Sequence, residues 1–445
     1  MPMTQEISRV VDLLDSSRNV IFGMDVGEAR AIVARGNPDE ICRIDGHFAL
    51  VGTDGTTVRM VRTLDRLMRY FIAKRASGPA LVISDRIDAI HRWLQCNGLD
   101  DQFHPSYTRM VPAHHVVEVR LVGCPDPNPT YQRFFTPVRG TLPADEGAIG
   151  ERYVRAVYDE IVKWLQTIPP QEPIGVCFSG GIDSGAVFLL AYHAMLALGM
   201  NPARLKAFSL SVGEGGQDVD QARAFLRDMD LDLFLEVIEV QRDDIDVVDA
   251  IRVIEDYKPL DVQAGAMMLA LCRGIHRRYP EWRYLLDGDG GDENLKDYPI
   301  ESRRAGTELT IRSVLNNPML YQEGWGVHSI KHSLTYSGGQ SRGCARSYAP
   351  AATNGFVTLS PYTARPVIEV AEAIPFIELT QWDEERLYRL KGEIVRRGVR
   401  AVTGLEMPCF PKRRFQHGVM AERAFADLFP DSPNTYRKTF LALYE

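Results

Sequence analysis

The sequence of 445 residues lacks several features that would place it in common protein classes. Its seven cysteines are scattered singly and form no Cys-x-x-Cys pair, which argues against a disulfide framework or a zinc site. No apolar run approaches the ~20 residues that span a bilayer. Residues 1–19 also lack the basic and apolar regions of an export signal. We therefore expect a cytoplasmic protein with reduced thiols and no membrane partner.

An excess of positive charge is also missing. The formal net charge is −8, with 45% hydrophobic and 25% charged residues, as in a soluble globular protein. The acidic balance argues against a nucleic-acid partner, because such proteins usually carry a basic face. At this length two domains are expected. The sequence does not determine the oligomeric state, and a homodimer stays open.

One glycine-rich stretch has the composition of an anion-binding loop. Residues 174–178 read as a buried strand, and an apolar helix follows at 185–198. The turn between them supplies hydroxyl donors, glycines that let backbone amides approach a phosphate, and a carboxylate for Mg²⁺: Ser179, Gly180, Gly181, Asp183 and Ser184. The Gly-Lys-Ser/Thr ending of a Walker A loop is absent, so phosphoryl transfer of that kind is not expected. A purely structural turn is the alternative.

Two styles of secondary structure divide the chain. Up to residue 140 short strands dominate, with a hairpin at 48–61, strands at 80–84 and 116–121 and a helix at 86–95. Residues 140–147 read as a linker. From residue 148 onward helices at 149–167, 218–229 and 264–278 alternate with strands at 174–178, 205–212, 233–240 and 284–286. This alternation predicts an α/β fold with a doubly wound parallel sheet and a ligand at the carboxyl ends of its strands. The region beyond residue 292 reads as helical and loop-rich, with a flexible surface loop at 337–341.

A second cluster, acidic and glycine-rich, follows the strand expected at 284–286. It combines carboxylates with glycines, a set that suits a hard cation bearing phosphate oxygens: Asp287, Gly288, Asp289, Gly290, Gly291, Asp292 and Glu293. The spacing excludes a calcium-binding loop, since position six counted from Asp287 is Asp292, where glycine is required. A plain acidic surface turn is the alternative.

Taken together, the two stretches resemble the asparagine synthetase B family, whose synthetase domain is shared with β-lactam synthetases and lasso-peptide cyclases. Residues 179–184 match its Ser-Gly-Gly-x-Asp-Ser loop, and residues 288–293 match its Gly-(Glu/Asp)-Gly-x-Asp-Glu motif. The resemblance implies that Asp183 and Asp292 hold Mg²⁺ on the phosphates of ATP. It also implies further nucleotide contacts at Phe208, Ser209, Leu210, Gly288, Asp289 and Gly290.

A third resemblance lies near the C-terminus. Residues 411–419 are similar to the family segment Arg-x-Lys-x-x-Phe-x-x-Gly, which implies that Lys412 stabilises charge as an amine attacks the adenylate. A fixed ammonium beside a developing oxyanion is a large electrostatic contribution. A solvated basic run is the alternative, because Arg413 and Arg414 follow. Lys391 matches a second family lysine more loosely. Tyr362 and Glu293 are candidates for the general base, although Glu293 also fits the metal cluster.

The N-terminal part departs from the family's glutaminase domain. Glutamine-dependent members begin Met-Cys, whereas this sequence begins Met-Pro-Met-Thr and its first cysteine is Cys42. Residues 44–50 resemble a later segment of that domain. We therefore expect residues 1–140 to form a shortened, glutaminase-like α+β unit of the Ntn type that does not hydrolyse glutamine. Residues 148–445 would form the ATP-pyrophosphatase domain, with a helical C-terminal portion.

The resemblance implies an ATP-dependent ligase that adenylates a small-molecule or peptide carboxylate, releases pyrophosphate and passes the acyl group to an amine. Ammonia, a second substrate or a group of the same molecule could supply that amine. Asp261 and Gln263 stand where asparagine synthetases favour threonine and arginine, which implies a carboxylate other than aspartate. The alternatives are a sulfur-inserting or base-modifying ATP pyrophosphatase and a non-catalytic scaffold.

Overall fold

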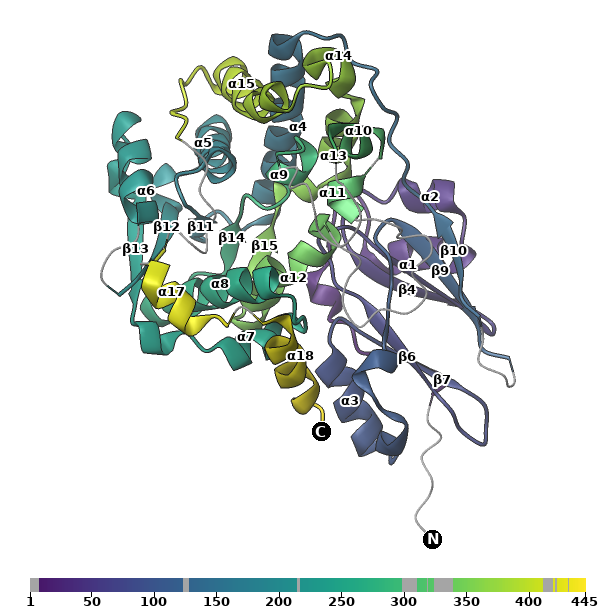
Figure 1. Cartoon of the computed structure of the whole chain (residues 1–445). Coiled ribbons are helices and arrows are strands. Elements are labelled where there is room, and N and C mark those ends of the chain that lie inside the picture. The colour runs from purple at the N-terminus through teal and green to yellow at the C-terminus, as the bar shows by residue number, and fades with distance from the viewer. Residues whose placement is uncertain are drawn as a thin grey trace. The chain divides into compact units, whose positions relative to one another are not determined.

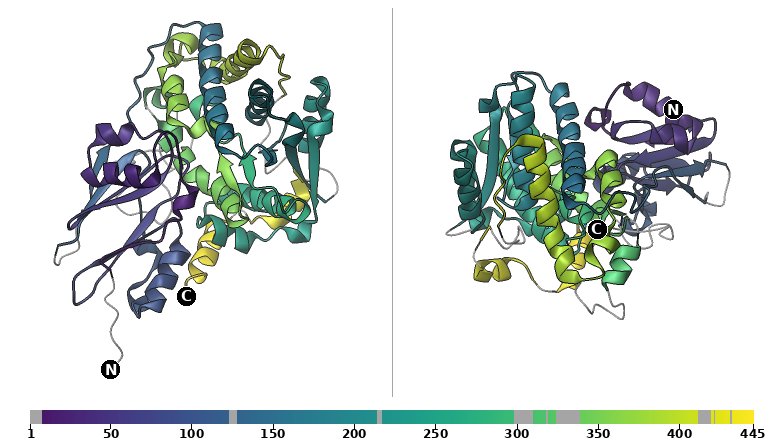
Figure 2. Two further views of the ribbon diagram at one scale, coloured as in Figure 1. Left: turned by 180° about the vertical axis from the view of Figure 1, so that it is seen from behind. Right: turned by 90° about the horizontal axis from the view of Figure 1, so that it is seen from above.

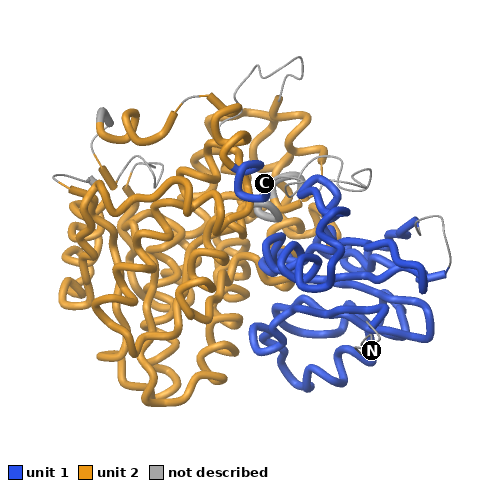
Figure 3. The backbone as a smooth tube through the Cα atoms, turned by 90° about the horizontal axis from the view of Figure 1, so that it is seen from below, with its two compact units in different colours: residues 1–136, 325–337, 440–445 blue, residues 137–324, 338–439 orange. Residues whose placement is uncertain are grey.

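The computed structural model describes residues 8–122, 128–213, 217–297, 310–317, 319–323, 339–410, 419–420, 422–430 and 432–445. The chain divides into two compact units, which Figure 3 distinguishes by colour. Unit 1 comprises residues 1–136, 325–337 and 440–445, and unit 2 comprises residues 137–324 and 338–439. In the part of the chain that is described, no helix is long and apolar enough to cross a membrane.

Unit 1 is built on two four-stranded sheets that pack face to face. Their strand orders are β1-β7-β6-β8 and β10-β9-β5-β4. Alternate side chains point to opposite faces of a strand, so Leu81 and Ile83 of β7 enter a common core with Val117 and Val119 of β9. The strands are β1 Val10–Asp12, β4 Ala49–Asp54, β5 Thr57–Arg62, β6 Arg69–Ala73, β7 Ala80–Ser84, β8 Arg109–Met110, β9 His115–Arg120 and β10 Thr130–Arg133.

Helices cover the outer faces of both sheets of unit 1. Ala80 and Val82, which point to the other side of β7, pack against Ile90 and Leu94 of α3 (Ile87–Cys96). On the second sheet, α1 (Val26–Arg35) packs against β4. The predicted hairpin, the strands near 80–84 and 116–121 and the helix near 86–95 are confirmed. The smaller elements are β2 Val20–Ile21, α2 Pro38–Cys42 and β3 Gly46–His47.

Unit 2 contains a five-stranded, entirely parallel sheet of order β13-β12-β11-β14-β15. The chain begins at the centre in β11, winds outward through β12 and β13, and then returns to add β14 and β15 on the other side. That order is the doubly wound arrangement, so the predicted α/β sheet is confirmed. The strands are β11 Ile174–Cys177, β12 Leu205–Val212, β13 Leu235–Val240, β14 Tyr284–Leu286 and β15 Val357–Leu359.

Helices cover both faces of the unit 2 sheet (Figures 1 and 2). One face carries α5 (Ile182–Ala197) and α6 (Gln217–Asp228), with α4 (Glu146–Thr167) and α15 (Glu384–Thr403) packed against α5. The other carries α7 (Val247–Ile254), α8 (Pro259–Arg278) and α12 (Gly339–Thr353). The pair α4 and α15 cross closely, because Gly398 meets the carbonyl oxygen of Gly150 where an added Cβ would lie only 2.2 Å away.

Several elements differ from the sequence-based expectation. The flexible surface loop expected at 337–341 is wrong from Gly339 onward, where α12 begins; residues 337 and 338 lie outside the described part. Burial of Cys344, Ala345 and Ala349 holds this helix in place despite its glycine and serine start. Strand β15 and helix α7 were not predicted. The remaining helices are α9 Gly291–Asn294, α10 Ile311–Asn316, α11 Leu320–Glu323, α13 Arg365–Ala373, α14 Phe376–Thr380, α17 Glu422–Leu428 and α18 Pro433–Ala442.

Candidate active site

The two glycine-rich loops leave neighbouring strands at the point where the sheet reverses its winding. Strand β11 pairs directly with β14, with Val176 opposite Leu286. Residues 179–184 follow β11 and residues 287–293 follow β14, so both loops emerge at the carboxyl edge, side by side. Doubly wound sheets bind ligands at this reversal, because the helices that follow the two strands lie on opposite faces and leave a crevice.

The first loop opens α5 with uncapped amides. Helix α5 begins at Ile182, and its N-cap residue Gly181 provides no side-chain cap. The hydroxyls of Ser179 and Ser184 lie 3.2 Å apart, and Ser184 Oγ also accepts from the Ser179 amide at 3.2 Å. The first amides of α5 and two hydroxyls are therefore gathered at the positive end of a sixteen-residue helix. This arrangement suits a phosphate group.

Glycines allow the loop to be this compact. Gly180 has a left-handed φ of +71°, and an added Cβ would lie 2.8 Å from the Ala222 backbone. On the second loop, a Cβ on Gly288 would lie 2.9 Å from the Ser184 amide nitrogen. A Cβ on Gly291 would lie 2.2 Å from Asp183 Oδ1. The two loops are therefore in contact, and their glycines are required by close approach.

Replacing Gly180 with alanine is expected to destabilise unit 2. Gly199 is the matched control, since its φ is also left-handed (+67°) but nothing lies within 4 Å of an added Cβ. Gly199→Ala should cost about 1 kcal/mol from backbone strain alone, and Gly180→Ala at least about 2 kcal/mol because the clash with Ala222 adds to it. Urea unfolding of both variants measures the difference. Equal losses would contradict the close packing of the loop.

A buried lysine joins the two loops. Lys391 of α15 places its Nζ 2.5 Å from Asp183 Oδ2, in contact with Asp292, and 3.5 Å from Asp297 Oδ2. Its side chain is 3% exposed, whereas the three carboxylates are 14–25% exposed. Burial disfavours the ammonium, but the three negative charges outweigh burial and raise the pKa of Lys391 well above its ordinary value. Lys391 is therefore a permanent cation at the meeting point of the loops.

The residues at this edge fit the Mg²⁺ and ATP that the motifs imply. Carboxylate oxygens are the ligands that Mg²⁺ prefers, and Asp289 Oδ2 is buried without a hydrogen-bond partner among the described residues. Asp183 and Asp292 stand on either side of one ammonium. No three acidic, histidine or cysteine side chains of the described residues form a metal cage by themselves. Mg²⁺ usually keeps phosphate and water ligands beside one or two carboxylates, which these residues can supply.

A comparison with protein families shows to which family this chain belongs. The family model described as asparagine synthase matches residues 169–393, just over half of the chain. The chain belongs to the asparagine synthase family. This membership makes it an ATP-dependent ligase with an ATP-pyrophosphatase domain. A search of curated proteins found no match. The matched range contains both loops and Lys391.

Two residues considered as general base in this asparagine synthase domain are buried. Tyr362 donates its hydroxyl hydrogen bond to the Asp183 carbonyl at 3.4 Å, and its ring stacks on Tyr153. Burial first, and then the charge of Asp183, raises the pKa of Tyr362 well above its ordinary value. The phenol therefore stays protonated near neutral pH and is a poor general base. Glu293 lies 3.8 Å from the guanidinium of Arg346, a residue of α12 that also lies 3.6 Å from Asp261.

The nucleotide contacts expected at Phe208, Ser209 and Leu210 fall on β12. Phe208 is fully buried, and its ring packs edge-on against Trp282 at 5.0 Å. Leu210 is 1% exposed. Ser209 Oγ is buried and has no hydrogen-bond partner within the described ranges. The structure thus places the Phe208 ring in the core and leaves Ser209 as the side chain of this group with an available polar atom.

Lys412 lies outside the described residues, so the structure gives no position for it. The chain is described again at Val419, whose carbonyl accepts a hydrogen bond of 3.1 Å from Val212. Val212 is the last residue of β12. Val419, the first described residue after the segment that contains Lys412, is therefore hydrogen-bonded to the carboxyl end of β12.

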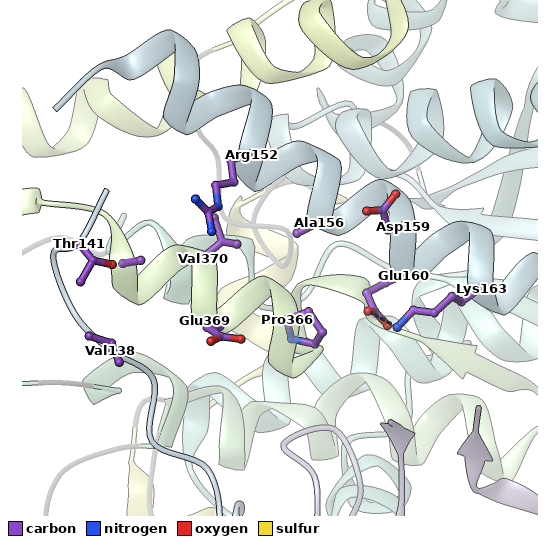
Figure 4. Close-up of a pocket in the computed structure, with 11 residues that line it drawn as sticks. Val138, Thr141, Arg152, Ala156, Asp159, Glu160, Lys163, Pro366, Glu369 and Val370 are labelled. Carbon is purple, nitrogen blue, oxygen red and sulfur yellow. Dashed lines mark ion pairs between the residues drawn. The ribbon is translucent and has the colours of Figure 1, made fainter. Parts of the chain in front are cut away.

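A pocket of about 430 Å³ lies elsewhere in unit 2, between α4, α13 and residues 138–141. Figure 4 shows the paired Glu160 and Lys163 at one end and Arg152 toward the other. None of the predicted site residues lines it. The candidate active site therefore lies at the carboxyl edge of the sheet and not in this pocket.

Proposed function

We propose that this member of the asparagine synthase family is an AMP-forming carbon-nitrogen ligase. It would adenylate a small-molecule or peptide carboxylate, release pyrophosphate and pass the acyl group to an amine, without hydrolysing glutamine itself. The observation that carries the proposal is the contact of Lys391 with Asp183 and Asp292. Two loops far apart in the sequence supply these carboxylates, and a third element supplies the cation between them.

In the first half-reaction a substrate carboxylate oxygen bonds to the α-phosphorus of ATP, and the bond to pyrophosphate breaks. The α5 amides and the hydroxyls of Ser179 and Ser184 would hold the phosphates. Asp183 and Asp292 would hold Mg²⁺, which neutralises phosphate charge when it is bound. Lys391 would stabilise the departing pyrophosphate as a fixed cation in a water-poor site.

In the second half-reaction an amine attacks the acyl carbon of the adenylate, and AMP leaves. The proposal assigns Lys412 to the oxyanion of the tetrahedral species, on the resemblance of its segment. Because Tyr362 is held protonated, Glu293 is the better candidate for removal of the amine proton. Asp261 and Gln263 would line the acyl pocket, and their replacement of the family's threonine and arginine favours a carboxylate substrate other than aspartate.

We propose that residues 1–140 form a glutaminase-like unit that does not hydrolyse glutamine. The layered α+β arrangement of unit 1 supports it, and residues 44–50, which carry the resemblance, lie at β3 and β4. The amine would then be ammonia made elsewhere, a second substrate or a group of the same molecule. We propose that the enzyme is cytoplasmic and has no nucleic-acid or membrane partner. Residues 148–445 would form the ligase domain. A monomer and a homodimer are both compatible with this proposal.

The competing functions are less well supported. A sulfur-inserting enzyme needs a reactive thiol near the nucleotide, and Cys177 is the cysteine next to the first loop. Burial raises the pKa of its thiol well above the ordinary value, and burial does the same for Cys272. Both thiols are therefore poor nucleophiles. A non-catalytic scaffold would have little reason to retain a buried ammonium with three carboxylates, because such clusters seldom add net stability.

The identity of the products tests the proposal directly. The full-length protein, incubated with ATP, Mg²⁺ and a panel of carboxylates and amines, is expected to form AMP and pyrophosphate in equal amounts. The Asp183→Asn variant is the control for contaminating enzymes. Formation of ADP and phosphate that depends on Asp183 would contradict adenylation. AMP without any amide product in the presence of every amine would contradict the second half-reaction.

A further inference from the structure

Lys296, three residues after the acidic cluster of the second loop, has an unusual backbone conformation. Lys296 has a left-handed φ of +58°, which is costly for a residue with a side chain. Its side chain is 2% exposed and forms an ion pair of 3.1 Å with Glu372 of α13, which is 1% exposed. The ammonium also lies 5.1 Å from the centre of the Phe376 ring. These buried contacts fix a conformation that the chain would otherwise avoid.

The left-handed backbone of Lys296 determines where the next residue, Asp297, places its side chain. The amide of Asp297 donates a 2.9 Å hydrogen bond to the Asp292 carbonyl, which closes a turn between the two aspartates. Asp297 Oδ2 lies 3.5 Å from Lys391 Nζ. Asp292 and Asp297 therefore reach the same ammonium from the two ends of one turn. Glu372 is held further by Arg139, whose Nε lies 3.4 Å from its other carboxylate oxygen.

Lys391 contacts the carboxylates that would have to bind Mg²⁺ when Mg²⁺ and ATP are present. Its ammonium contacts Asp183 and Asp292, the carboxylates that the proposed function assigns to Mg²⁺. A divalent cation and an ammonium compete for the same carboxylate oxygens. When Mg²⁺ and ATP bind, Lys391 must give up part of these contacts while its side chain stays buried. A buried cation needs a counter-charge, and Asp297 is the third carboxylate within 4 Å of it.

We propose that Asp297 is a positioning residue that takes over the Lys391 ammonium when Mg²⁺ and ATP occupy Asp183 and Asp292. The Lys296–Glu372 pair fixes the backbone next to Asp297 and so keeps the Asp297 carboxylate near the ammonium. The inference rests on the proposed function and deepens it, because it describes how the site changes from its nucleotide-free to its loaded state. Asp297 acts through the Lys391 ammonium, which makes it a positioning residue and not a catalytic one.

The test is calorimetric binding of α,β-methylene-ATP, which cannot release pyrophosphate, to the full-length protein at a series of Mg²⁺ concentrations. At low Mg²⁺ the Asp297→Asn variant is expected to bind about tenfold more weakly than wild type. The difference should shrink as Mg²⁺ rises, since Mg²⁺ then displaces the ammonium by mass action. Asp228→Asn, at an exposed aspartate on α6, is the matched control and should bind as wild type does.

A double-substitution cycle separates this role from a general charge effect. In a Lys391→Met background, Asp297→Asn should no longer change the Mg²⁺ dependence, because the ammonium on which it acts is gone. Glu372→Gln, which leaves Asp297 in place but weakens its support, should shift the dependence in the same direction by a smaller factor. Thermal unfolding confirms that each variant is folded.

Three results would overturn the inference in distinguishable ways. Equal binding by wild type and Asp297→Asn at every Mg²⁺ concentration would remove Asp297 from the exchange and leave the proposed function intact. A loss that is the same at low and high Mg²⁺, or that persists in the Lys391→Met background, would show a role that does not act through the lysine. Failure of wild type to bind the analogue would overturn the proposed function and this inference with it.

Discussion

Lys391→Met is expected to produce the largest single loss of both stability and activity. The substitution keeps an apolar stem of similar length but leaves Asp183, Asp292 and Asp297 without the ammonium that they share. Removing one partner of a buried ion pair is strongly destabilising; because the carboxylates are partly exposed, we expect a loss of about 3 kcal/mol, at the low end of the usual range. Pyrophosphate release should fall at least about a hundredfold, since a fixed cation beside the leaving group is lost.

Urea unfolding with and without Mg²⁺ measures the stability part of this prediction. Mg²⁺ should stabilise the variant more than wild type, because it replaces the missing positive charge between the aspartates. The pKa of Lys391 is raised in the folded state, so its contribution is fully present below the unfolded pKa of about 10.4. It is lost only as the pH rises through the higher folded value. The difference between variant and wild type should therefore be constant from about pH 7 to pH 9.

Lys206→Met is the matched control for Lys391→Met. Lys206 lies on β12, and its ammonium contacts the Leu233 carbonyl near the surface. Its replacement should change stability by less than about 0.5 kcal/mol. If Lys391→Met were as stable and as active as this control, Lys391 would not be the counter-charge of the two loops.

The second large effect is expected from Lys412→Met, which should separate the two half-reactions. If this lysine stabilises the oxyanion formed when the amine attacks, its loss should leave substrate-dependent exchange of pyrophosphate into ATP nearly unchanged. Formation of the amide should fall at least about a hundredfold, the size of effect that loss of an oxyanion contact produces. Parallel assays of exchange and of amide product measure the two steps.

The neighbouring arginine supplies the control for this experiment. Arg413→Met removes one positive charge from the same basic run and should affect both assays by only a small factor. A decrease of exchange and of amide formation by the same factor in Lys412→Met would assign the lysine to nucleotide binding. Equal behaviour of the two variants would favour a solvated basic run without a catalytic role.

The sequence pattern predicted the central elements of unit 2 because their signals are local. The stretch before Ser179 is apolar and short, the glycines impose a turn, and a long apolar helix follows, so strand, loop and helix can be assigned from neighbouring residues. Strand β15 was missed because three residues are too few to show a period. Helix α12 was missed because its glycine and serine start resembles a loop, whereas its burial against α8 depends on residues far away in the chain.

The candidate site shows the same division. The motifs pointed to Asp183 and Asp292, whose role as Mg²⁺ ligands stays a prediction, whereas Lys391 had only a loose match. A usable signal was present, since Lys391 lies on the buried stripe of an amphipathic helix that also contains Leu387 and Ile394. Lysine on such a stripe needs a buried counter-charge. The sequence could not show which carboxylates supply that charge.

The sequence by itself therefore determined the chemical groups of this protein: two glycine-rich loops, the aspartates beside them, and the alternation of strands and helices that makes a parallel sheet. Those properties follow from backbone sterics and from apolar periodicity, which act between near neighbours. Only the tertiary structure decided that β11 and β14 pair, that Ser179–Ser184 thereby meets Gly288–Glu293, and that Lys391 stands between their carboxylates. Strand order and the balance of buried charge depend on contacts between residues far apart in the chain, which no local pattern specifies.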